Sequence, residues 1–174
     1  MHFIGVASLI GPRTDAADKK MFALKLAQEG LSMRILVPVD GSDSANRAAA
    51  HAVALLQGRP DAEIILLNVQ NQQGLDISDV SRVTSVEANT KYAVDQSKKA
   101  LAAAIELCRN GQVKFETRSA FGNTAEMISK ICTEVAADQV IMGTRGLGLW
   151  YSVALGSVST RVIQLALVPV TVVK

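Results

Sequence analysis

The sequence is poor in the residues that secreted, metal-binding and nucleic-acid-binding proteins use most. Its two cysteines, Cys108 and Cys132, have neither a Cys-x-x-Cys partner nor a histidine neighbour. We therefore predict two reduced core thiols rather than a disulfide or a metal site. The 18 basic and 16 acidic residues nearly balance, so the charge gives no reason to expect binding to nucleic acid or to an anionic membrane.

Long hydrophobic runs are also missing. No apolar run approaches the roughly 20 residues that a membrane-spanning helix needs. The opening stretch MHFIGVASLIG lacks the basic start of a signal peptide, and Lys19 and Lys20 follow its apolar part. We therefore expect a cytoplasmic protein. Hydrophobic residues make up 49% of the chain, which is enough for a folded core.

Residues 1–32 differ in pattern from the rest of the chain. Thr14 is a suitable N-cap for a short helix over 15–29. The stretch MRILVPVDGS, which begins at Met33, is typical of the start of a domain. We predict an N-terminal extension without chemistry of its own, followed by a single domain over 33–174.

Within that domain, short apolar runs alternate with segments of helical periodicity. Continuous apolar runs are typical of strands covered on both faces, and a weaker alternating run favours an edge strand at 112–119. Strands between helices predict an α/β fold in which right-handed crossovers build a parallel five-stranded sheet with helices on both faces. The expected strands are 34–39, 62–69, 112–119, 138–143 and 168–173, and the expected helices are 43–57, 83–109, one capped by Asn123, and 155–167.

Two strand ends carry residues suited to an anionic ligand. Ligands of open parallel sheets bind beyond the carboxyl ends of strands, where the winding direction reverses. Asp40 follows the first strand, and Gly143 opens the stretch GTRGLGLWYSVALGS after the fourth. Glycine lets backbone N–H groups approach an anion, and the helix that begins near Gly156 offers free N–H groups. The hydroxyls of Ser157 and Ser159 could add donors and reach a phosphate-bound Mg²⁺.

These glycines match neither a Walker loop nor a Rossmann fingerprint, and a tight turn without a ligand would explain them equally well. However, the spacing Gly143-x2-Gly146-x9-Gly156-Ser157 resembles the nucleotide-binding signature of the ATP-binding branch of the universal stress protein family. Further counterparts over residues 33–174 are LVPVDGS, LLNV, VIMGTRG, GSVS and VPVTVV. The resemblance implies a Rossmann-like, adenine nucleotide alpha-hydrolase-like sheet of strand order 3-2-1-4-5.

The resemblance also implies roles for single residues. Asp40 would contact the adenosine end of ATP, and the main chain of Val69 would hold adenine. The glycines and Ser157 would surround the ribose and the phosphates. Alternatives without a ligand are a turn or cap for Asp40, plain core for Val69 and a helix cap for Ser157. The expected binding set is Pro38, Val39, Asp40, Val69, Gly143, Arg145, Gly146, Gly156, Ser157, Val158 and Ser159.

One departure from the family concerns the phosphates. No Lys or Arg lies between Gly146 and Gly156, where the family often has basic residues. Neutralisation of the phosphates would then depend on backbone amides, Mg²⁺ and Arg145. We also expect that valine in place of Gly143 or Gly156 abolishes ATP binding and leaves the fold intact.

The last strand has the composition of an edge open to pairing. No proline or charge interrupts the run Val170, Thr171, Val172 and Val173, and an unprotected edge can pair with another chain. The resemblance implies a homodimer formed by antiparallel pairing of these strands.

The sequence offers no convincing general base for ATP hydrolysis, which needs a positioned water. His2 lies in the extension, His51 lies in an Ala-rich helix, and the helix dipole explains Glu126. We therefore expect an ATP-binding stress-response regulator rather than an enzyme, with any hydrolysis slow. Two alternatives stay open, a slow ATPase or nucleotidyl-transferring relative of the same fold and a dimeric adaptor that no longer binds nucleotide.

Overall fold

The computed structural model describes residues 33–70, 86–144 and 155–174. For residues 86–92 it describes the backbone alone. The compact unit that contains them is Met33–Lys174. The expected extension over 1–32, with its helix at 15–29, lies outside the described residues. The elements, in chain order, are β1 (Arg34–Pro38), α2 (Asp43–Leu56), β2 (Glu63–Gln70), α4 (Val86–Asn110), β3 (Lys114–Phe121), α5 (Thr124–Glu134), β4 (Gln139–Gly143), α6 (Ser157–Leu165) and β5 (Val170–Val173).

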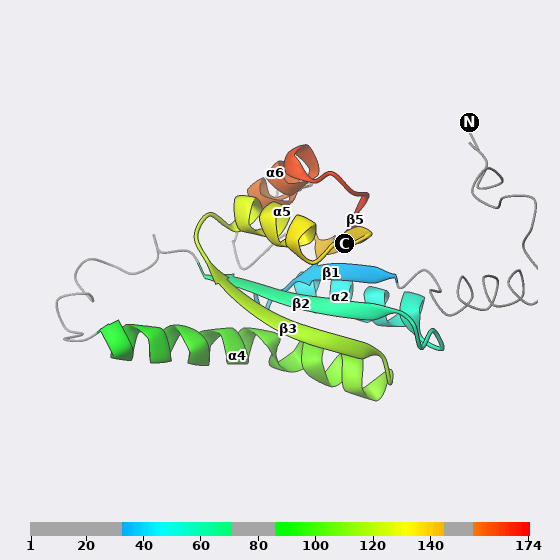
Figure 1. Ribbon diagram of the computed structural model, residues 1–174, viewed down its shortest axis with the longest axis horizontal. Coiled ribbons are helices and arrows are strands. Elements are labelled where there is room, and N and C mark those ends of the chain that lie inside the picture. The colour runs from blue at the N-terminus through cyan, green and yellow to red at the C-terminus, as the bar shows by residue number, and fades with distance from the viewer. Residues whose placement is uncertain (1–32, 71–85, 145–154) are drawn as a thin grey trace, which may run out of the picture. The chain divides into compact units, whose positions relative to one another are not determined.

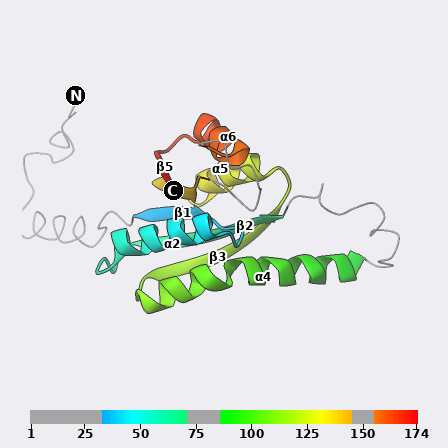
Figure 2. The same ribbon diagram turned by 180° about the vertical axis from the view of Figure 1, so that it is seen from behind.

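The five strands form one parallel sheet of order β3-β2-β1-β4-β5. Helices α2 and α4 cover one face of the sheet, and α5 and α6 cover the other (Figures 1 and 2). The predicted fold class and strand order are therefore confirmed. The order places β1 and β4 side by side in the middle of the sheet, and the winding direction reverses between them.

Alternation along the central strands fills a separate core on each face. Val37, Ile64 and Leu66 belong to the core under α2 and α4, whereas Leu36 and Ile65 belong to the core under α5 and α6. Successive side chains of a strand point to opposite faces, so a sheet that is covered on both sides needs apolar residues at every position. This is why β1 and β2 are continuous apolar runs.

Small side chains and caps fix the position of α2. Ala48, Ala49 and Ala52 are fully buried, which lets the helix axis lie close to the sheet. The side chain of Ser42 accepts a hydrogen bond from the Ala45 N–H at 3.2 Å and so satisfies one of the free donors of the first turn. The helix therefore begins directly after the β1 end that carries Asp40.

The two edges of the sheet differ in character. On β3 the side chains of Lys114, Glu116 and Arg118 are exposed, as expected for a protected edge. This strand begins two residues later than predicted because Gln112 adopts a φ of 54° in the turn after α4. The other edge, β5, carries no charge and is partly exposed along its whole length.

Candidate functional site

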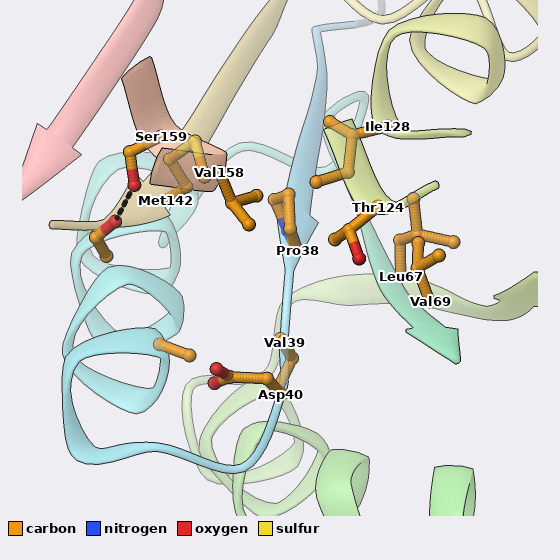
Figure 3. A pocket seen from close by; sticks show the side chains of 12 residues that line it. Pro38, Val39, Asp40, Leu67, Val69, Thr124, Ile128, Met142, Val158 and Ser159 are labelled. Carbon is orange, nitrogen blue, oxygen red and sulfur yellow. Dashed lines mark hydrogen bonds between the residues drawn. The ribbon is translucent and has the colours of Figure 1, made fainter. Parts of the chain in front are cut away.

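A pocket of about 180 Å³ lies at the carboxyl ends of β1, β2 and β4, at the reversal point of the sheet (Figure 3). Its walls come from both sheet faces and from three helices. The volume is below the range of about 300–1,000 Å³ that is usual for small-molecule sites, so the described walls could enclose only part of a small molecule. The lining residues are Pro38, Val39, Asp40, Ala45, Leu67, Val69, Thr124, Ile128, Met142, Gly143, Val158 and Ser159.

The pocket brings together most of the binding set expected from the sequence. From that set, Gly156 and Ser157 lie at the start of α6 and do not line the pocket. Arg145 and Gly146 lie outside the described residues. The residues from the expected set that do line it are Pro38, Val39, Asp40, Val69, Gly143, Val158 and Ser159.

Sequence reasoning missed several wall residues because their local pattern is that of core residues. Ile128 and Met142 are buried apolar residues of α5 and β4, and Thr124 directly follows the N-cap Asn123. The sequence around these residues indicates only that they lie on the side of the helix or strand that faces the core. Packing of α5 against the sheet turns part of that inner side into the pocket wall.

Asp40 is both a turn residue and a wall residue. Its Oδ1 accepts a hydrogen bond from the Ser42 N–H at 3.0 Å, which shapes the turn into α2. The neighbouring Gly41 adopts a φ of 85°, a conformation that favours glycine. Among the described walls of the pocket, Asp40 is the one charged side chain. The turn role and the binding role expected from the sequence are therefore compatible.

The backbone N–H and C=O of Val69 lie beyond the last residue of β1, because β1 ends at Pro38 and β2 continues to Gln70. The Val39 N–H donates to the Leu67 carbonyl at 2.8 Å, and the Gly122 N–H donates to the Gln70 carbonyl at 3.0 Å. Backbone groups alternate sides along a strand, so those of Leu67 face β1 and those of Gln70 face β3. Val69 therefore points its N–H and C=O to the β1 side, next to the pocket that its side chain lines.

Gly143 lies against the first turn of α2. A Cβ built on Gly143 would be 2.7 Å from the carbonyl carbon of Ser44 and 2.9 Å from its Cβ. Distances this short do not occur in real packing, and the helix backbone cannot yield without moving the whole helix. The expectation that valine at Gly143 leaves the fold intact is therefore wrong, because this glycine is needed for packing.

The start of α6 lacks the caps that the other short helices have. Its N-cap is Gly156, which has no side chain to offer, and no acidic residue lies in the first turn. By contrast, Ser42 caps α2 and Asn123 caps α5, each with an acid in the first turn. Ser157 is the first helical residue, so the helix-cap alternative for it is wrong. The uncapped turn leaves N–H donors and a positive dipole end for an anion.

Ser159 ties α6 to the end of β4. Its hydroxyl is buried and donates to the Gly143 carbonyl at 3.0 Å, with a longer contact of 3.3 Å to the Thr144 carbonyl (Figure 3). The Gly156 N–H also donates to the Thr144 carbonyl, at 2.8 Å. The Ser159 proton is thus already used, and only the oxygen lone pairs remain for a ligand.

The chain is similar to known proteins of one family. The universal stress protein family model matches residues 32–174. The chain belongs to the universal stress protein family. A universal stress protein of Methanocaldococcus jannaschii is 32% identical over 149 residues, which cover 84% of each chain. A universal stress protein of Thermus aquaticus is 33% identical over 140 residues, which cover 80% of this chain and 97% of the relative.

Solved structures of the universal stress protein fold also match. The structure of hypothetical protein MJ0577 has a TM-score of 0.70 at 29% identity, covering 82% of this chain and 96% of that one. Several more distant matches contain a nucleotide, including the following two. One is the Archaeoglobus fulgidus universal stress protein with dAMP (TM-score 0.59, 21% identity, 82% and 98% covered). The other is an Arabidopsis thaliana family protein with AMP (TM-score 0.57, 22% identity, 82% and 91% covered).

Among the described residues of this universal stress protein, no group of three or more His, Cys, Asp and Glu side chains could hold a metal ion. Among the helices that the structure describes, none is long and apolar enough to cross a membrane.

Proposed function

We propose that this universal stress protein binds ATP and acts as a nucleotide-dependent regulator in the form of a homodimer. The observation that carries the proposal is that the pocket has three different walls. The main chain of Val69 is on one side, the carboxylate of Asp40 lies at the end of β1, and the first turn of α6, through Val158 and Ser159, is on the third side. These walls suit a base, a ribose and a phosphate, respectively.

The Val69 wall suits adenine. Adenine presents an amino donor beside a ring-nitrogen acceptor, which complements one backbone C=O and one N–H. Guanine has a carbonyl acceptor in place of that amino donor, so it would oppose the Val69 carbonyl. Apolar side chains of Leu67, Ile128 and Met142 offer flat contact to the faces of the base. We therefore expect adenine nucleotides to bind more tightly than guanine nucleotides.

The opposite walls suit the rest of ATP. The carboxylate of Asp40 can accept hydrogen bonds from ribose hydroxyls. The first-turn N–H groups of α6, from Ser157 to Ser159, can donate to phosphate oxygens. We assign Mg²⁺ to the phosphate oxygens of the bound nucleotide, with the Ser157 hydroxyl within the same turn as a further ligand. Relatives with bound AMP and dAMP support the choice of an adenine nucleotide as the ligand.

We infer binding rather than turnover. Hydrolysis needs a group that positions or deprotonates a water near the γ-phosphate. The carboxylate of Asp40 belongs to the β1 end, apart from the α6 residues Val158 and Ser159 in Figure 3. His51 is exposed on α2 and is not part of the described pocket walls.

For the homodimer we propose pairing between two copies of β5. This strand is bonded to β4 on one side and forms the edge of the sheet on the other. It carries no charged side chain, whereas the β3 edge carries three. A partly exposed apolar edge is stabilised when a second copy satisfies its backbone groups.

Isothermal titration calorimetry with Mg-ATP tests the nucleotide site. Wild-type protein should bind, and Asp40→Ala should bind about 10- to 100-fold more weakly, as for the loss of a hydrogen bond to a charged group. Asp61→Ala, which removes an exposed carboxylate elsewhere, should bind like wild type. Mass spectrometry of the denatured, freshly purified protein should also detect an adenine nucleotide. A wild-type protein without affinity for ATP, ADP or AMP would contradict the proposal.

A further inference from the structure

We propose that Asn68 is a positioning residue that ends the hydrogen-bond ladder between β1 and β2 one rung early, and so keeps the Val69 N–H available for the base. The inference rests on the proposed function, since it names the residue that prepares the adenine-binding main chain. Asn68 is not among the residues that line the pocket. Its role is therefore indirect, through Val39 and Val69.

The ladder shows where regular pairing stops. The Val39 N–H donates to the Leu67 carbonyl at 2.8 Å. In a regular parallel ladder the next rung would run from the Val69 N–H to the Val39 carbonyl. Among the backbone hydrogen bonds of the described residues that rung is absent, and the Asn68 side-chain amide donates to the Val39 carbonyl instead, at 2.7 Å. The Asn68 side chain thus bonds to the same carbonyl that the Val69 N–H would use.

Asn68 reaches this carbonyl from the face opposite to the Val69 side chain. Alternation along β2 places Asn68 with Ile64 and Leu66, on the side covered by α2 and α4. Asn68 is only 3% exposed, and a buried amide is costly unless its donor and acceptor are satisfied. Breaking the hydrogen bond to Val39 would therefore leave a buried amide donor unsatisfied.

Gln70 determines which way the Asn68 amide points. The Gln70 side-chain amide donates to the Asn68 Oδ1 at 2.6 Å. Because Oδ1 faces this donor, the Nδ2 group faces the Val39 carbonyl. Gln70 is the last residue of β2 and is partly exposed, so it can be changed with little effect on the core.

Hydrogen exchange in the nucleotide-free protein tests the ladder directly. In wild type the Val69 amide should exchange at least about 10-fold faster than the Leu67 amide, since only the latter lies within the ladder. In Asn68→Leu the Val39 carbonyl is released, and the Val69 amide should slow by about 10-fold as the missing rung forms. Equal protection of the two amides in wild type, or an unchanged Val69 rate in Asn68→Leu, would overturn the proposal.

A second variant covers the case in which Asn68→Leu fails to fold. Gln70→Glu replaces the donor that faces Oδ1 with an acceptor and should turn the Asn68 amide around, so the same slowing of Val69 is expected. ATP affinity measured by calorimetry should fall about 5- to 10-fold, as for the loss of one hydrogen bond. Gln57→Glu, the same change at an exposed glutamine, should alter neither readout. If Gln70→Glu changes neither, the positioning role is wrong.

The two proposals fail differently. If wild-type protein binds no adenine nucleotide, the proposed function is wrong, and the exchange rates still decide whether Asn68 ends the ladder. If wild-type protein binds ATP and both variants bind it with wild-type affinity, the proposed function stands and the role of Asn68 is rejected.

Discussion

Gly143 and Ser44 touch across the boundary between β4 and α2, and a Cβ on Gly143 would lie 2.7 Å from the Ser44 carbonyl carbon. The end of the central strand and the first turn of the helix therefore approach as closely as a glycine permits. Gly143 also lines the pocket. A residue that the sequence marks as a ligand-binding glycine is thus also a packing residue.

We predict that Gly143→Ala lowers the free energy of unfolding by about 1–3 kcal/mol, the usual cost of overpacking. Urea denaturation measures it. Gly156→Ala is the matched control, because Gly156 has a φ of −72° that any residue adopts, and it should cost less. Equal stability of Gly143→Ala and wild type would show that the contact relaxes freely.

A substitution at the uncapped start of α6 should affect the stability of the fold and the affinity for ATP in opposite directions. Gly156→Asp should cap the helix and complement its dipole, which retains or raises the free energy of unfolding by about 0.5–1 kcal/mol. The added charge should nevertheless weaken ATP binding by about 10-fold or more, since it competes with the phosphates for the same N–H groups. Urea denaturation and calorimetry measure the two effects.

Gly156→Asn is the control for that charge. It offers a similar cap without a negative charge, so its loss of ATP affinity should be smaller than that of Gly156→Asp. If both variants bind ATP as tightly as wild type, the phosphates do not lie at α6.

The two sheet edges predict different responses to one added lysine. Val172→Lys places a charge on β5 and should convert the homodimer to monomers, as measured by light scattering after size exclusion. Thr117→Lys makes a similar change on the exposed β3 edge and should leave the dimer intact. A wild-type monomer, or a dimer that survives Val172→Lys, contradicts pairing through β5.

Burial raises the pKa of the Cys108 thiol from 9.0 to about 11 and also raises that of Cys132. Between pH 9 and 11 the unfolded chain releases a Cys108 proton that the folded protein keeps. The free energy of unfolding should therefore fall with rising pH, by about 1.4 kcal/mol per pH unit from this group. Below pH 9 the contribution of Cys108 to the free energy of unfolding should not change with pH. Urea denaturation across this range should show a shallower decline in Cys108→Ala.

The folded protein should also protect its thiols. Both cysteines are buried, and a raised pKa leaves little thiolate, the reactive form, near pH 8. A thiol reagent should therefore label native protein much more slowly than protein unfolded in urea. Equal labelling rates would contradict the burial of Cys108 and Cys132.

Much of the fold could be predicted from the sequence because both faces of the sheet are buried. Continuous apolar runs such as β1 and β2, separated by helical periodicity, are sufficient for a parallel α/β sheet. Cap residues such as Asn123 also act locally, so its bond to the Glu126 N–H was predictable. The sequence predicts the start of β3 two residues too early, because the left-handed turn at Gln112 has no distinct signal in a non-glycine residue.

The sequence by itself determined the fold class, the order of elements and the two strand ends at which a ligand could bind, because periodicity and glycine spacing are local properties. Only the tertiary structure decided that Thr124, Ile128 and Met142 line the same pocket as Asp40, that Gly143 packs on Ser44, and that the Asn68 amide bonds to the Val39 carbonyl. These contacts join residues far apart in the chain. They exist because the sheet brings the ends of β1, β2 and β4 together beneath the helices.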